Sequence, residues 1–107
     1  MRTTADGAVG TAKRLVALFE SDRESVQQRG GRATGSALRV HDALRQRPVS
    51  TLNAISKRSG LSFPGASAGM QVLAELRITR ELTGRKRNRI FAYDRYLAIL
   101  SEGTEPL

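Results

Sequence analysis

The spacing of apolar residues changes once along this 107-residue chain. As far as Leu76 they recur at the three- and four-residue steps of amphipathic helices. From Ile78 to Thr83 the period changes to the two residues of a strand, with residues 78, 80 and 82 alternating with residues 79, 81 and 83, and a second short strand covers residues 90–93. Residues 84–88, between the two strands, include Gly84 and Asn88, which suit a turn. The sequence therefore predicts a mostly α fold with one small β-hairpin.

Turn-forming residues divide the remaining sequence into helices. Pro48 ends one helix, because the residue before a proline disfavours helical dihedrals, and the three glycines within residues 28–35 predict a loop or linker. Residues 1–7 are expected to be frayed. The expected helices cover residues 8–26, 36–46, 51–60, 64–76 and 94–100, with Ser36, Thr51 and Asp94 as N-terminal caps. We therefore expect an N-terminal helix with its Gly-rich linker (residues 1–34), followed by a second domain (residues 35–107).

The third and fourth expected helices are joined by the short segment Ser56–Ser62. Gly60 suits the positive φ of a tight turn, and Pro64 is tolerated in the first turn of a helix. Two helices joined in this way and followed directly by a basic hairpin indicate a winged helix-turn-helix.

Positive charge is concentrated in and around the hairpin. The chain has 18 Lys and Arg against 10 Asp and Glu, a net charge of +8. Residues 77–95 contain seven of the cations and two acids, so this stretch contributes 7 − 2 = +5. Such a local excess favours a polyanionic partner, and we expect double-stranded DNA.

The residues expected to contact DNA lie on the fourth helix and in the hairpin. The outer face of that helix should hold residues 65, 67, 68, 71 and 72, where Ser67 and Gln71 can bond base edges or phosphates. Because this face has no Lys or Arg, packing on another protein is the alternative. The cations at the hairpin tip suit phosphates, and the alternative there is a solvated turn that protects an edge strand. The expected contact residues are Ser62, Ser67, Gln71, Arg85, Lys86, Arg87, Asn88 and Arg89.

Several classes of site are disfavoured by composition. Without cysteine, and with His41 as the one histidine, the chain lacks the residues for disulfides or a clustered Cys/His metal site. We expect no cofactor, no catalytic residue and no membrane segment, and a soluble cytoplasmic protein. His41 is expected to be a core or hydrogen-bonded histidine. The phenylalanines and tyrosines should pack on helices or strands, with Tyr96 free enough to bond a partner.

Almost the whole chain, from about Thr4 to Leu107, resembles the C-terminal region of Fic-family proteins. The resemblance is carried by SGLSFP (residues 59–64), ELTGRKRNRIFAYD (81–94) and YLAILSEGTEP (96–106). In addition, TAKRLVALFESDR (11–23) is similar to the helix that joins this region to the Fic domain. The resemblance implies a winged-helix module appended to an AMP transferase. The family's His-Pro-Phe-x-x-Gly-Asn-Gly-x-x-Arg motif is absent from this sequence, so the catalytic activity is not carried over.

Three residues depart from that family pattern. Arg77 stands where glycine commonly ends the recognition helix, Ser56 stands where alanine is usual, and Gly69 occupies a helical core position. Each departure would cost about 0.5–1 kcal/mol if nothing compensates it.

Two functions from different classes fit these residues. The first is a DNA-binding module in transcription regulation, with a log–log salt slope near −3 if about three or four phosphates are neutralised. The second is a protein-interaction or dimerisation module that regulates a Fic-type AMP transferase. The amphipathic first helix favours the second, because it needs an apolar partner in the winged core, in a homodimer or in the Fic catalytic domain.

Overall fold

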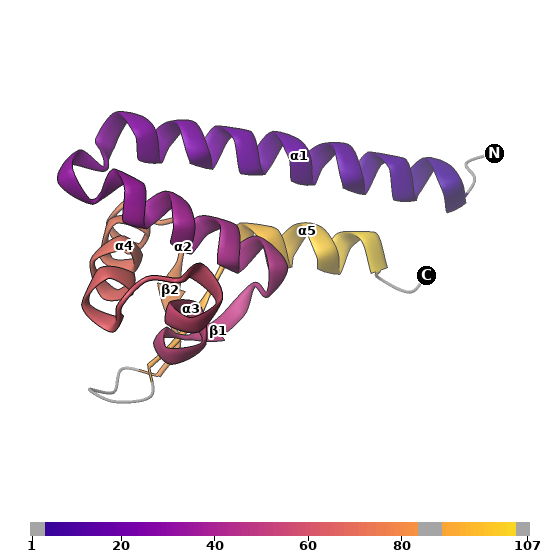
Figure 1. Cartoon of the computed structure of the whole chain (residues 1–107). Coiled ribbons are helices and arrows are strands. Elements are labelled where there is room, and N and C mark those ends of the chain that lie inside the picture. The colour runs from indigo at the N-terminus through magenta and orange to yellow at the C-terminus, as the bar shows by residue number, and fades with distance from the viewer. Residues whose placement is uncertain (1–3, 84–88, 105–107) are drawn as a thin grey trace.

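Five α-helices and a three-stranded antiparallel sheet make up the part of the chain that the computed structural model describes, residues 4–83 and 89–104 (Figure 1). This confirms a mostly α fold with a small β-hairpin. The elements are α1 (Thr4–Arg29), the 3-10 turn η1 (Gly31–Ala33), α2 (Thr34–Gln46), β1 (Val49–Thr51), α3 (Leu52–Ser59), α4 (Phe63–Glu75), β2 (Arg80–Glu81), β3 (Ile90–Ala92) and α5 (Asp94–Thr104).

The glycine-rich segment between α1 and α2 is a tight reversal, so the prediction of a loop over residues 28–35 was wrong. The amide of Gly30 donates to the Val26 carbonyl at 2.7 Å, and a Cβ on Gly30 would lie 2.7 Å from that same oxygen. Gly31 has φ 58°, and the Thr34 hydroxyl donates to its carbonyl at 2.8 Å. Helix α1 continues to Arg29, later than expected, and it also begins earlier, at Thr4. Helix α2 begins at Thr34, without the predicted cap from Ser36.

A buried polar chain joins α1 to the rest of the fold. Asp22 of α1 is 2% exposed and accepts a hydrogen bond from the Tyr93 hydroxyl at 2.6 Å and a longer one from Arg95 at 3.5 Å. Since the Tyr93 proton is directed at Asp22, the phenol oxygen is left to accept from Nε2 of His41 at 3.0 Å. Burial lowers the pKa of the His41 imidazole. Burial also raises the pKa of the Tyr93 hydroxyl, and the hydrogen bond from this hydroxyl to Asp22 raises it further. The expectation of a hydrogen-bonded core His41 is confirmed.

Two of the aromatic predictions were wrong. The Tyr96 hydroxyl donates to the Arg45 carbonyl at 3.0 Å, so it is bonded within the protein and is not free for a partner. Its ring packs edge-on against Phe19 of α1, with ring centroids 5.0 Å apart. Phe63, at the start of α4, is 49% exposed and does not pack in the core.

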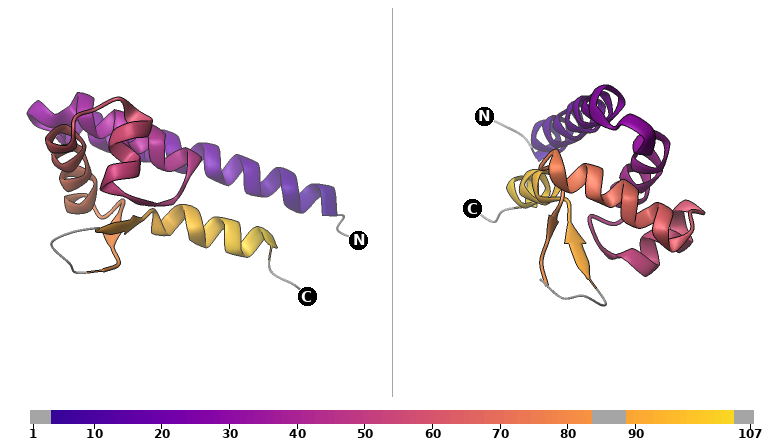
Figure 2. Two further views of the ribbon diagram at one scale, coloured as in Figure 1. Left: turned by 60° about the horizontal axis from the view of Figure 1, so that its bottom comes forward. Right: turned by 90° about the vertical axis from the view of Figure 1, so that its left-hand side faces the viewer.

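The sheet has the order β1-β3-β2, and β1 was not predicted. Residues 49–51 follow Pro48 and pair antiparallel with β3, with Ser50 opposite Phe91. The hairpin strands are shorter than the alternation suggested: β2 has two residues, and Ile78 and Thr79 before it are buried without strand pairing. Figure 2 shows the two hairpin strands extending together from the helical body.

Helices α2 and α4 pack closely at the centre of the core. Gly69 of α4 faces α2 so tightly that a Cβ there would lie 2.7 Å from the Ser36 carbonyl oxygen and 2.9 Å from the Val40 side chain. This close approach accounts for glycine at a helical core position, because any larger residue would push the helices apart. The core residues around the contact include Ala37, Leu44, Ala66, Met70 and Leu73.

Changing Gly69 to Ala should destabilise the protein. Alanine is the better helix former by about 1 kcal/mol, but its methyl group would overlap the α2 backbone, and overpacking costs about 1–3 kcal/mol. We expect a lower urea midpoint with an unchanged slope. The matched control is Gly35→Ala in α2, where a Cβ meets nothing within 4 Å. It should be neutral or stabilising, and a Gly69→Ala protein as stable as the Gly35→Ala protein would contradict the close contact.

Candidate nucleic-acid interface

The turn between α3 and α4 is fixed by side-chain hydrogen bonds. The Thr51 hydroxyl caps α3 by accepting from the Ala54 amide at 3.1 Å, as predicted. Gly60 ends α3 with φ 77°, which confirms the positive φ expected there. The Ser56 hydroxyl donates to the Leu61 carbonyl at 2.6 Å across the turn. Serine in place of alanine at residue 56 is therefore compensated by this bond.

Ser62 begins α4 and caps it. Its hydroxyl accepts from the Gly65 amide at 3.2 Å, and Pro64 occupies the first helical turn, as predicted. On the outward face of α4, Ala68 and Gln71 are exposed and Ser67 is half-buried. Val72, predicted for that face, is instead half-buried against the core. The face that α4 presents is thus largely polar and has no Lys or Arg.

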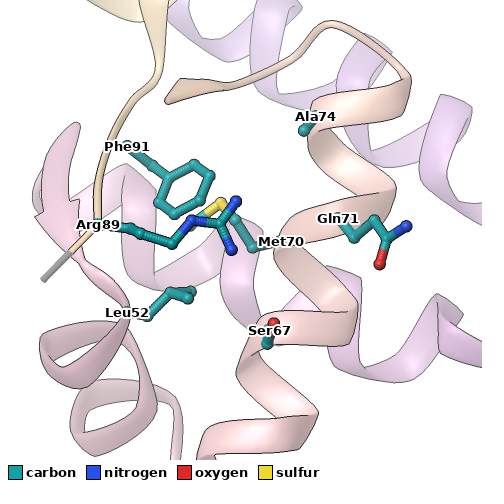
Figure 3. A pocket seen from close by; sticks show the side chains of 7 residues that line it. All are labelled: Leu52, Ser67, Met70, Gln71, Ala74, Arg89 and Phe91. Atoms are coloured by element: carbon teal, nitrogen blue, oxygen red, sulfur yellow. The ribbon is translucent and has the colours of Figure 1, made fainter. Parts of the chain in front are cut away.

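A small pocket of about 110 Å³ separates α4 from the hairpin. It brings together three residues predicted from sequence, Ser67, Gln71 and Arg89, with apolar residues beneath them. Its walls are Leu52, Ser67, Met70, Gln71, Ala74, Arg89 and Phe91 (Figure 3). In Figure 3 the Arg89 guanidinium extends from the residue before β3 towards α4, whereas the Gln71 side chain leaves the opposite side of the helix.

Arg89 is held by the protein's own groups. Its Nε and Nη2 donate to the same oxygen of Glu81, at 3.1 and 2.9 Å, and the guanidinium lies 5.0 Å from the centre of the Phe91 ring. Thr83 donates to the other oxygen of Glu81 at 3.1 Å. Arg89, expected to contact DNA from the hairpin, is therefore ion-paired within the protein. Arg85, Lys86, Arg87 and Asn88 lie outside the described residues.

Other cations of the basic stretch are also paired. Arg80 donates to Asp94 at 2.7 Å, and this hydrogen-bonded ion pair raises the pKa of Arg80. Arg95 reaches Asp22, an acid from a distant part of the sequence. The two acids of residues 77–95 thus each bind an arginine, and the remaining positive charge of the hairpin is concentrated at residues 85–87.

Sequence reasoning missed Arg58, in the last turn of α3. Its Nη1 is buried and has no hydrogen-bond partner within the described structure, which leaves an N–H donor beside the helix-turn-helix. Its neighbour Lys57 is exposed. The signal was present as a Lys-Arg pair immediately before the turn. Sequence reasoning also missed an acid on the outward face of α4. The Gln71 side chain donates a hydrogen bond to Glu75 at 3.4 Å, so the Glu75 carboxylate lies on the same face of α4 as Gln71.

The end of α4 directs the chain into the hairpin through a strained residue. Arg77 has φ 62°, the one positive φ of a non-glycine residue in the described structure. Its amide donates to Ala74 at 3.0 Å and that of Ile78 donates to Leu73 at 2.9 Å, which is the hydrogen-bond pattern of a Schellman cap. Glycine is the usual residue at such a position, because a side chain there is crowded by the backbone.

Comparison with protein-family models, with curated proteins and with solved structures found no match for this chain. Within the described residues, no group of His, Cys, Asp and Glu is arranged to hold a metal ion. None of the helices described is both long and apolar enough to cross a membrane.

Replacing Arg77 by Gly should stabilise the fold by about 0.5–1 kcal/mol, because relief of the left-handed strain exceeds the extra entropy of glycine in the unfolded chain. Urea denaturation measures the change. Arg77→Ala removes the same charge but keeps the strained Cβ, so it should remain near the stability of the parent protein. If both variants shift stability equally, the charge and not the backbone is responsible.

Proposed function

We propose that this chain is a DNA-binding winged-helix module that lies with α4 in a major groove and its basic hairpin along the adjacent backbone. The observation that carries the proposal is the arrangement of α3, the turn and α4 beside the hairpin that contains residues 85–87. The outer face of α4 has no Lys or Arg and can enter a groove, and the cations of the hairpin can neutralise phosphates.

The two parts of this surface would contribute differently. On α4, Gln71 offers a donor and an acceptor that match the edge of adenine, and the Ser67 hydroxyl suits either a base or a phosphate. Arg85, Lys86 and Arg87 supply affinity without sequence preference. Arg89 is already fixed towards α4 by Glu81, so its contact with DNA would be preorganised, at the cost of competition from that carboxylate.

A further cation supports the same placement. The exposed Lys57 lies in the last turn of α3, next to the connection to α4. In a helix-turn-helix the first helix crosses the DNA backbone, so this ammonium group is suitably placed for phosphates. The resemblance to the Fic-family C-terminal region agrees with a role of this kind in transcription regulation in the cytoplasm.

A second function, control of a Fic-type AMP transferase through protein contacts, is favoured by two observations. The α4 face lacks cations, and the large apolar side chains of Phe63 and Val16 are exposed. In this case α4 and the hairpin would face protein, and DNA affinity would be absent.

A salt titration separates the two functions. Fluorescence anisotropy with a random-sequence duplex should give an affinity that falls with salt, with a log–log slope of about −3 from three phosphate contacts. Changing Arg85, Lys86 and Arg87 together to Ala should remove most of that slope and weaken binding to every sequence alike.

The matched control is the triple variant Arg23→Ala, Arg29→Ala, Arg39→Ala, which alters net charge equally at exposed positions of α1 and α2. It should keep nearly the full slope. Equal losses in the two triple variants would mean that only overall charge matters, and a parent protein without affinity at low salt would exclude the DNA-binding function.

A further inference from the structure

Part of α1 has no covering element. Beyond the C-terminal end of α2, the N-terminal half of α1 runs beside α5 alone (Figures 1 and 2). On the side of α1 that faces the rest of the fold, Leu15, Leu18 and Phe19 are at least half-buried. Val16, in contrast, is 55% exposed, at the centre of a shallow depression lined by Ala12, Lys13, Val16, Ala17 and Glu20. We call these five residues the α1 strip.

We propose that the α1 strip is the contact surface for a second copy of this chain, paired antiparallel about a two-fold axis between Val16 and Ala17. In that register residue i of one copy lies opposite residue 33 − i of the other. Lys13 of each copy then faces Glu20 of its partner, so the strip is complementary to itself in charge as well as in its small apolar centre. This proposal concerns a different surface from α4 and the hairpin.

The charge around the α1 strip supports a second copy more than another partner. The chain as a whole carries +8, which opposes self-association. Within the α1 strip Lys13 and Glu20 balance, a sum of 1 − 1 = 0, so two strips can approach without net repulsion. Lys13 and Glu20 form no ion pair within the described structure and are available to a partner.

The small residues allow close contact of the helices. Ala12 and Ala17 flank Val16, so two helices can pack with the valines against the alanines of the other copy. A parallel arrangement would instead place Lys13 against Lys13 and Glu20 against Glu20, which is repulsive at both positions.

Sedimentation equilibrium of the full 107-residue chain tests this proposal. The parent should show a concentration-dependent dimer. Lys13→Glu alone and Glu20→Lys alone should each weaken dimerisation about tenfold, because the two-fold symmetry turns both ion pairs into like-charge contacts. The double variant Lys13→Glu, Glu20→Lys should restore it, and a mixture of the two single variants should form a heterodimer.

The remaining variants locate the contact. Val16→Asp should give a monomer with an unchanged circular dichroism spectrum, since the side chain is exposed. Asn53→Lys, at an exposed position of α3, adds the same charge away from α1 and should leave the dimer intact. A parent that stays monomeric at all concentrations, a double variant that fails to recover, or a dimeric Val16→Asp protein would each overturn the proposal, whatever the DNA titration shows.

Discussion

The contact between α2 and α4 at Gly69 is the constraint on which the rest of the structure depends. Without a Cβ at this position, the α4 backbone lies against the Ser36 carbonyl of α2, and the neighbouring Leu73 and Met70 fill the core. This contact sets the direction in which α4 presents Ser67 and Gln71. It also sets where the hairpin begins, because the cap at Arg77 follows α4 directly. A single close helix contact therefore positions both parts of the proposed DNA surface.

The cations in and around the hairpin fall into two groups, those paired with a carboxylate of the protein and those in the basic run of residues 85–87. Arg80, Arg89 and Arg95 are each bound to a carboxylate of the protein, so they stabilise the hairpin and its junction with α1. Residues 85–87 carry the charge that these acids leave uncompensated. The α1 strip is neutral overall and apolar at its centre, and this contrast is why we assign polyanion binding to one surface and self-association to another.

Local sequence signals predicted the elements whose structure is decided locally. Thr51, Gly60 and Pro64 each act on the backbone within a few residues, and their predicted roles are confirmed. Strand β1 was missed because residues 49–51 become a strand only by pairing with β3, more than forty residues away. The reversal at Gly30 and Gly31 was taken for a loop because glycine content does not distinguish a tight turn from a flexible linker. The ion pair of Arg89 was missed, since its Glu81 partner comes from the opposite strand of the hairpin.

Chemical-shift mapping of the ¹⁵N-labelled protein, titrated with a duplex at low salt, shows whether α4 and the hairpin, and not α1, face DNA. We expect the amides of Ser67 and Gln71 and the side-chain Nε of Arg89 to shift together with saturation, while Val16 stays unchanged. Shifts confined to α1, or a spectrum that the duplex does not alter, would contradict it.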